Sequence, residues 1–266
     1  MHGPTFLSIG NCDGLESFSL SISNLKELHI SHCKNLKSVP NKMHDLTSLN
    51  GFYISNCPGI KCISDSGLPP NLTWLGIYGC VGIESILGSG LFPNLTDLEI
   101  VDCPGIESIP DRGFPPNLRS LIIDCKNLKK PMQEWGLSNL TSLLSLKVYW
   151  ICPDPDVLPT SLTSLVVGTV ENMKSITRGL LQNLNSLQDL TIEACPKLQS
   201  LPKEGLPPLL ERLWIINCPL LKQRCLEEKG DYWPLIARIP YIVVQDYKSH
   251  TSSETKQKLC LCFKTG

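Results

Sequence analysis

The sequence predicts an α/β solenoid from three observations: a motif that recurs at a near-constant interval, strand-like alternation within it, and connections too short for long helices. The motif occurs at Leu25–Cys33, Leu49–Cys57, Leu72–Cys80, Leu95–Cys103, Leu187–Cys195 and Leu210–Cys218. Its opening leucines lie at positions 25, 49, 72, 95, 118, 143, 162, 187 and 210, so the interval is 19 to 25 residues. A period of this length indicates repeats that each stack on their neighbours.

Each position of the motif has a structural reason. The pattern L-x-x-L-x-L-x-x-C is that of leucine-rich repeats. Alternation at Leu98-Glu99-Ile100 is the period of a β-strand, so Leu98 and Ile100 should face the core and Glu99 the solvent. Cys103 follows where the strand turns, and a small thiol can be buried there and bond to the backbone. Further apolar anchors stand three or six residues after the cysteines: Leu15, Leu36, Ile60, Ile83, Ile106, Leu128, Leu198, Leu221, Val39, Ile63, Ile86, Ile109 and Leu201.

The connecting segments have two forms. Paired prolines in Gly67–Leu72 and its relatives forbid a regular helix. Asp45–Leu49, Asn139–Leu143 and Asn183–Leu187 suit a short helical turn. We therefore expect a leucine-rich-repeat horseshoe, with a parallel β-sheet on the concave face and mostly irregular, turn or short helical returns on the convex side.

Domain bounds and irregular repeats follow from the same pattern. We expect a solenoid of about ten repeats over residues 1–246, its array ending near 218–246, and a flexible tail over 247–266. The sixth repeat loses one residue before Cys125, and Val170 replaces a cysteine later, so a kink is expected there. The repeat pattern already begins at Leu7, and no polar capping segment precedes it. We therefore expect this chain to be the C-terminal part of a longer repeat array or the product of a split gene.

Composition narrows the class of protein. Hydrophobic residues make up 42% and the formal net charge is −1, which suits a packed core and disfavours a nucleic-acid-binding surface. No apolar run approaches the roughly 18 residues of a membrane span, and no secretory signal opens the chain. The thirteen cysteines are odd in number and evenly spaced, which favours reduced thiols and a cytoplasmic or nuclear location.

Longer phrases resemble a known family. They are Cys103–Pro110, Cys195–Pro202, Gly205–Cys218, Cys218–Cys225 and Gly230–Pro240. Together they resemble the repeat region of plant intracellular immune receptors, the coiled-coil, nucleotide-binding, leucine-rich-repeat disease-resistance proteins. The resemblance implies a domain that restrains the receptor and helps to recognise pathogen effectors. It implies no switching activity here, because the chain has no G-x-x-x-x-G-K-[ST] phosphate loop.

The sequence contains no strong motif for nucleotide binding, metal binding or catalysis. Met43-His44-Asp45 matches the family's nucleotide-sensing tripeptide, but it lies in a connecting segment and is interpreted as a loop. His29 should point outward and Cys33 inward, so they are not expected to share a metal. No nucleophile, histidine and acid form a catalytic motif. We therefore expect no enzyme activity, metal, cofactor or small-molecule substrate.

The outward strand positions are the predicted partner-binding surface. They include Tyr53, Trp74, Tyr78, Glu99, Lys147, Tyr149, Glu193 and Trp214, beside Thr191 and Ile216. Exposed aromatic residues are enriched at binding hot spots, although some would only cover the sheet. The charges are expected to be mixed, which favours a protein partner.

Three functions remain open. The first is the recognition and restraint module of an immune receptor, with a pathogen effector or a nucleotide-binding domain as partner. The alternative is the substrate-recognition repeat of an F-box ubiquitin-ligase adaptor, because Ile63–Leu68 locally resembles its repeat. The third is an extracellular receptor ectodomain, whose plant version carries a Leu-x-Gly-x-Ile-Pro phrase; Ile106–Pro110 lacks that glycine.

Overall fold

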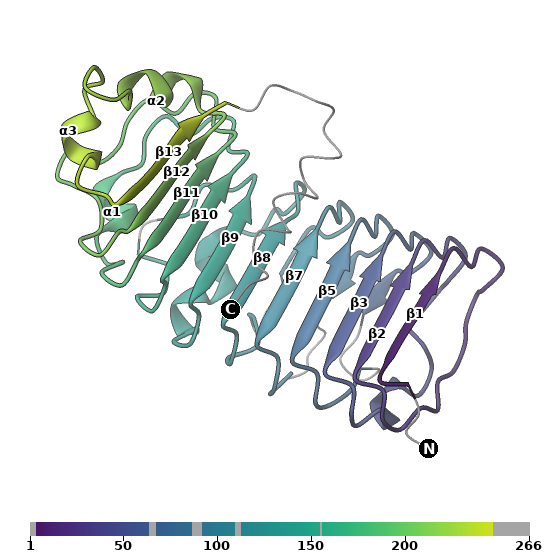
Figure 1. Ribbon diagram of the computed structural model, residues 1–266. Helices are drawn as coiled ribbons and strands as arrows, with labels where there is room; N and C mark the ends of the chain where they lie inside the picture. Colours follow the sequence, from purple (N-terminus) through teal and green to yellow (C-terminus); the bar gives the residue numbers. More distant parts are fainter. Residues whose placement is uncertain (1–3, 64–67, 87–91, 110–112, 155, 247–266) are drawn as a thin grey trace.

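The computed structural model describes residues 4–63, 68–86, 92–109, 113–154 and 156–246, so the predicted tail lies outside the described residues. Eleven parallel strands form one sheet, ordered along the chain (Figure 1). They are β1 (Phe6–Gly10), β2 (Glu27–Ser31), β3 (Gly51–Ser55), β5 (Trp74–Tyr78), β7 (Asp97–Val101), β8 (Ser120–Asp124), β9 (Ser145–Tyr149), β10 (Ser164–Gly168), β11 (Asp189–Glu193), β12 (Arg212–Ile216) and β13 (Tyr241–Gln245). The predicted repeat solenoid is confirmed.

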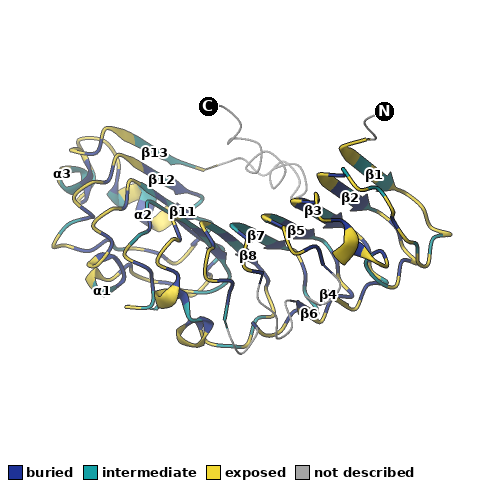
Figure 2. Cartoon of the chain, turned by 90° about the horizontal axis from the view of Figure 1, so that it is seen from below, coloured by how far each residue is buried: buried dark blue, intermediate teal, exposed yellow. Residues whose placement is uncertain are grey.

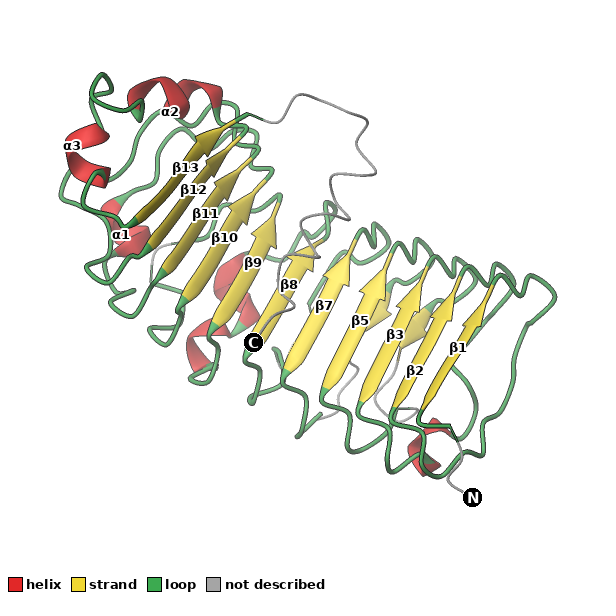
Figure 3. Cartoon of the chain, viewed as in Figure 1, coloured by secondary structure: helices red, strands yellow, loops and turns green. Residues whose placement is uncertain are grey.

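The connecting segments contain little regular structure (Figure 3). The short strands β4 (Cys62–Ile63) and β6 (Ser85–Ile86) pair with each other. The helices are η1 (Met43–Asp45), η3 (Met132–Trp135), η4 (Leu137–Asn139), α1 (Arg178–Leu181), α2 (Pro219–Arg224) and α3 (Trp233–Ile236). In the described parts of the chain, no helix has the length and apolarity that a bilayer crossing requires.

The sheet lies on the inner side of a curved stack, and the connecting segments lie on its outer side (Figure 2). Each strand presents its second and fourth residues to the core between these two layers. Leu98 and Ile100 of β7 are both fully buried, whereas Glu99 between them is half-buried on the other face. The register repeats this arrangement, since Leu98 pairs with Leu75 and Leu121, and the predicted inward and outward assignment is confirmed.

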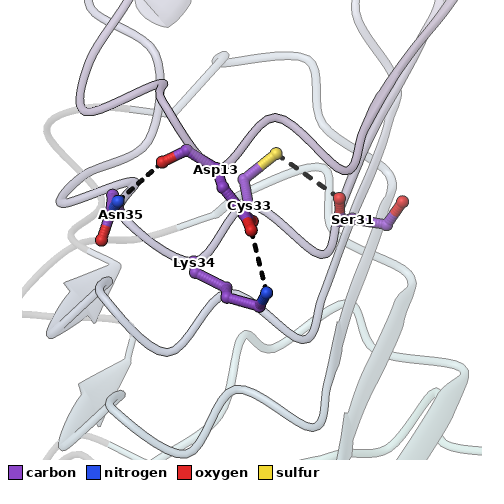
Figure 4. A network of polar contacts seen from close by, with 5 residues as sticks. All are labelled: Asp13, Ser31, Cys33, Lys34 and Asn35. Carbon is purple, nitrogen blue, oxygen red and sulfur yellow. Dashed lines mark hydrogen bonds and ion pairs between the residues drawn. The ribbon is translucent and has the colours of Figure 1, made fainter.

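In most repeats a left-handed residue precedes the cysteine at the end of the strand and turns the chain there. The residue before the cysteine has a positive φ at His32, Asn56, Gly79 and Asp102, for example 53° at Asp102. Buried thiols then donate to the carbonyl two residues earlier, as Cys33 does to Ser31 at 3.4 Å (Figure 4). The predicted column of buried cysteines bonded to the backbone is confirmed for Cys33, Cys57, Cys103, Cys195 and Cys218, whereas Cys12 of the first repeat is exposed.

Polar side chains join neighbouring repeats beside this column. Asn35 donates its amide to the carbonyl of Asp13 at 2.7 Å, and Lys34 pairs with the Asp13 carboxylate at 2.8 Å (Figure 4). Elsewhere Asn71, Asn94 and Asn117 each donate to a backbone carbonyl in the preceding repeat. These bonds satisfy carbonyl groups that no helix or sheet would otherwise pair.

The residue missing before Cys125 is the left-handed one. Asp124 ends β8 and is followed at once by the buried Cys125, and no positive φ separates them. The β8–β9 register accordingly stops at Ile123 with Val148, one pair short of its neighbours. The row of strands changes level at this point (Figure 1). The Asp124 carboxylate, at the end of β8, accepts a hydrogen bond from the Trp150 indole N–H at 2.7 Å. The predicted kink is thus placed at the β8–β9 step.

Thiol labelling tests the buried column. We expect iodoacetamide at about pH 8 to modify the exposed Cys12 and Cys62 quickly, and the column only after unfolding. Burial removes access and raises the pKa of Cys57 to about 11 and that of Cys125 to about 12, so little thiolate forms. Mass spectrometry after timed labelling, with a urea-unfolded sample as control, measures this. A disulfide joining Cys57 to Cys80 would contradict it.

Candidate functional site on the concave face

The outward residues of the large sheet form three rows across the strands. The first, third and fifth residue of every strand point away from the core, and the register aligns them. We call these positions the concave face. Its first row runs through Phe6, Glu27, Gly51, Trp74, Asp97 and on to Tyr241, and its middle row through His29, Tyr53, Gly76 and Glu99 to Trp214 and Val243. The third row contains Tyr78, Asp124, Tyr149 and Glu193.

All eight residues predicted for partner binding lie on the concave face, but they do not form one row. Trp74 is in the first row, whereas Tyr53, Glu99, Lys147 and Trp214 are in the middle row and Tyr78, Tyr149 and Glu193 are in the third. Their side chains are half-buried, because they lean on neighbouring strands. The structure divides them between the two ends of the sheet.

Five rings gather over strands β1 to β5, and we call them the aromatic cluster: Phe6, His29, Tyr53, Trp74 and Tyr78. The Phe6 and His29 rings meet edge to face at 4.8 Å, and His29 lies 5.2 Å from Tyr53. The Tyr53 ring is stacked on Trp74 at 6.2 Å and lies 5.0 Å from Tyr78. The cluster is thus continuous across four strands of the sheet.

Two glycines make room for this arrangement. A Cβ at Gly76 would stand 2.8 Å from the Tyr78 ring and 3.0 Å from the Trp74 ring, so both rings occupy the space above this residue. A Cβ at Gly51 would stand 3.5 Å from the Trp74 ring. The absence of a side chain at these two positions therefore leaves the space above the backbone to the rings.

His29 lies inside the aromatic cluster with a nitrogen atom unused. Its Nε2 is buried without a hydrogen-bond partner among the described residues, and Glu27 Oε2 is 3.8 Å away. Burial lowers the pKa of His29, and the Glu27 carboxylate offsets part of this effect. The ring is therefore an uncharged member of the aromatic cluster at neutral pH.

The other end of the concave face has paired charges. The Tyr149 ring lies above Gly168, where a Cβ would approach it to 2.5 Å, and its hydroxyl bonds to Glu193. Burial raises the pKa of Glu193, an effect that the Tyr149 hydrogen bond partly offsets. Arg212 binds Asp189 with two nitrogens, one of them at 2.6 Å. Trp214 meets Tyr241 edge to face at 5.7 Å.

Charge is distributed unevenly, which corrects the expectation of mixed charges. In the described strands β1 to β8, the concave face has the carboxylates Glu27, Asp97, Glu99 and Asp124 and no lysine or arginine. In β9 to β13 it has Lys147 and Arg212 against Asp189 and Glu193. The aromatic cluster therefore lies in an acidic half, and the other half is balanced.

Sequence reasoning missed several members of this face. Phe6, Glu27 and Asp97 stand at outward positions that the strand alternation alone would have identified, and His29 was considered only as a metal ligand. Arg212 and Tyr241 are the first residues of β12 and β13. The described residues contain no group of histidine, cysteine or acidic side chains placed to hold a metal ion.

This architecture defines a leucine-rich-repeat protein, with one strand per repeat and a continuous side-chain surface on the inner curve. Among curated proteins, the chain is 32% identical over 231 residues to an Arabidopsis thaliana protein named for disease resistance. The match covers 85% of this chain and 13% of that protein, so the chain spans a small part of its relative's length. The predicted resemblance to plant disease-resistance proteins is confirmed.

Solved structures similar to the chain include one described as a circular leucine-rich-repeat protein and one described as an internalin. The circular repeat protein CroV588 has a TM-score of 0.45 at 16% identity, over 93% of this chain and 44% of that one. An internalin, InlF from Listeria monocytogenes, has a TM-score of 0.39 at 16% identity, over 90% and 84% of the two chains. No family model matches the chain.

Proposed function

We propose that this chain is a protein-binding module of a plant intracellular immune receptor and that it binds its partner through the concave face. The partner is a pathogen effector or the nucleotide-binding domain that such repeats restrain. The observation that carries the proposal is the continuous cluster of rings, with carboxylates beside it, on the inner curve of the sheet. The similarity to a disease-resistance protein over 85% of the chain supports the immune context.

Binding without substrate turnover is the second part of the proposal. Several polar groups of the concave face are bonded to each other: Tyr78 donates to Glu99, and Arg212 pairs with Asp189. Such pairs fix the shape of a surface, whereas a catalytic nucleophile needs an adjacent base within hydrogen-bond reach. We further propose that the chain works in the cytoplasm or nucleus and that any nucleotide switch lies outside these residues.

A pull-down from plant tissue tests the proposed surface. The wild-type chain is compared with the triple variant Tyr78→Ala/Tyr149→Ala/Trp214→Ala, which removes rings from both halves of the concave face. We expect the variant to lose the proteins that the wild type enriches, because aromatic anchors dominate interface energies. Mass spectrometry with isotope-labelled samples quantifies the loss.

The control removes exposed apolar side chains from elsewhere. Val81, Leu209 and Leu220 are 55%, 57% and 45% exposed and lie outside the concave face, so Val81→Ala/Leu209→Ala/Leu220→Ala should keep every partner. Circular dichroism confirms that both variants are folded. A folded concave variant that retains all partners would show that this surface is not used, and a wild type that enriches nothing would contradict the binding function.

A further inference from the structure

The first row of the concave face places a ring between two carboxylates. The register aligns Glu27 with Gly51, Gly51 with Trp74, and Trp74 with Asp97. Neighbouring strands lie ~4.8 Å apart, so the backbone positions of Glu27 and Asp97 are about 14 Å apart, with Trp74 between them in the row. Trp74 lies over Gly51, and Tyr53 is stacked beside it at 11° to its plane.

Both carboxylates retain capacity for a ligand. The Glu27 side chain is 55% exposed, and His29 Nε2 at 3.8 Å is its nearby polar group. Asp97 accepts one hydrogen bond, from the Thr96 hydroxyl at 2.7 Å. A carboxylate offers about four acceptor sites, so an arriving cation finds unused lone pairs on each.

Two cations of the chain itself lie over aromatic rings, and one of them also pairs with a carboxylate. Lys126 Nζ lies 5.0 Å from the centre of the Trp150 ring, whose N–H is bonded to Asp124. Arg224 lies 4.4 Å from the centre of the Tyr232 ring and 3.4 Å from the Asp231 carboxylate. A ring face and a nearby carboxylate attract a cation together, because the quadrupole and the charge act in the same direction.

We propose that the acidic half of the concave face binds an extended segment of a partner protein through two basic side chains, preferably arginines. The segment crosses the strands over Trp74, with one guanidinium at Glu27 and the other at Asp97. An extended chain advances ~3.4 Å per residue, so the ~14 Å span matches basic residues four positions apart, which point to the same side. This inference rests on the proposed binding function and identifies the chemistry of the partner.

The planar guanidinium suits this site better than an ammonium group. It stacks on a ring while its edge donates two hydrogen bonds to a carboxylate, which the compact lysine head cannot do. The balanced half of the concave face offers no comparable carboxylate, because Asp189 is already paired with Arg212 and Glu193 is already hydrogen-bonded to Tyr149.

Titration of the full 266-residue chain with short peptides tests the proposal. The probe is a glycine–serine dodecapeptide with two arginines four positions apart; the comparison peptides have adjacent arginines, two spaced lysines, or two spaced glutamates. Indole N–H signals in ¹H–¹⁵N spectra report binding, and single Trp→Phe variants assign them. We expect the spaced arginine peptide to move the Trp74 signal, to leave the Trp214 signal in place, and to bind most tightly of the four.

Matched variants separate the two halves of the face. Trp74→Ala and the double variant Glu27→Gln/Asp97→Asn should each weaken the spaced arginine peptide about tenfold. Trp214→Ala and Glu193→Gln, the equivalent changes in the balanced half, should change its affinity by less than about twofold. The inference would be overturned if both sets of variants lost the same affinity for the spaced arginine peptide, or if the wild type bound the glutamate peptide as tightly as the arginine peptide.

The outcome is distinguishable from failure of the proposed function. If the pull-down depends on the concave face while no arginine peptide moves the Trp74 signal, the binding function stands and this partner chemistry is wrong. The C-terminal residues Lys256, Lys258 and Lys264 supply a second test. If replacing all three by glutamine raises peptide affinity about tenfold, the chain's own tail is the occupant, and a separate protein partner is wrong.

Discussion

Replacing Leu98 by alanine is expected to lower the free energy of unfolding by about 2–5 kcal/mol, which is a large share of the stability of a domain of this kind. Leu98 is fully buried in β7, between Leu75 and Leu121 of the neighbouring strands. The repeats on both sides hold their backbones in register, so the site cannot collapse around the missing atoms. The loss therefore includes a cavity contribution beside the transfer of the side chain.

The adjacent residue supplies the control for this experiment. Glu99 faces the other side of β7 and accepts the Tyr78 hydroxyl, so its removal would break a hydrogen bond. Glu99→Gln keeps an acceptor oxygen and is expected to change stability by less than about 0.5 kcal/mol. Urea unfolding followed by circular dichroism gives both values. Similar losses for the two variants would mean that the inward and outward positions of β7 are misassigned.

A methyl group at Gly105 is expected to cost about 1–3 kcal/mol, although it adds only one carbon atom. Its Cβ would stand 2.5 Å from the Ile83 carbonyl oxygen and 3.0 Å from that of Val81. Both obstacles are backbone atoms of the preceding repeat, so two stacked turns must separate. The same denaturant series on Gly105→Ala measures the loss.

The first repeat provides a matched comparison. Gly14 has the same place after Cys12 that Gly105 has after Cys103, but among the described residues nothing lies within 4 Å of its added Cβ. Gly14→Ala is therefore expected to leave stability within about 0.5 kcal/mol of wild type. If the two alanine variants lose the same stability, stacking between turns is not the reason for the glycine.

An asparagine at the same position is expected to destabilise less than alanine. Asn35 and Asn127 occupy the equivalent place in their repeats and donate to the carbonyls of Asp13 and Pro104 at 2.7 and 2.9 Å. Gly105→Asn can make this bond to the Val81 carbonyl once the turns have moved apart, which offsets part of the strain. A variant less stable than Gly105→Ala would show that the turn cannot adopt the geometry found at Asn35.

The repeat architecture was predictable because its information is local and periodic. The alternation at Leu98-Glu99-Ile100 determines which side chains face the core, and the cysteine marks where each strand turns. The kink was also predictable, because one residue is missing before Cys125. The physical reason, the absence of a left-handed residue between Asp124 and that cysteine, required the backbone angles.

The proposed binding surface, the concave face, was predictable in its location but not in its organisation. Strand alternation identified Tyr53, Trp74 and Trp214 as outward, yet it carries no information about which repeats are neighbours in register or how far a ring leans. The grouping of Phe6 and His29 with the tyrosines depends on pairs that are 21 to 24 residues apart in the chain.

Repetition in the sequence thus determined the solenoid, its core and which side chains lie on the concave face, since each repeat contacts mainly its neighbours and obeys one local pattern. Only the tertiary structure decided how that face is divided. Its acidic half arises because the register places Glu27 and Asp97 in one row with Trp74, and Gly51 and Gly76 leave the space above them to the neighbouring rings. The balanced half arises because Arg212 stands beside Asp189, a pairing that exists only once β11 and β12 are in register.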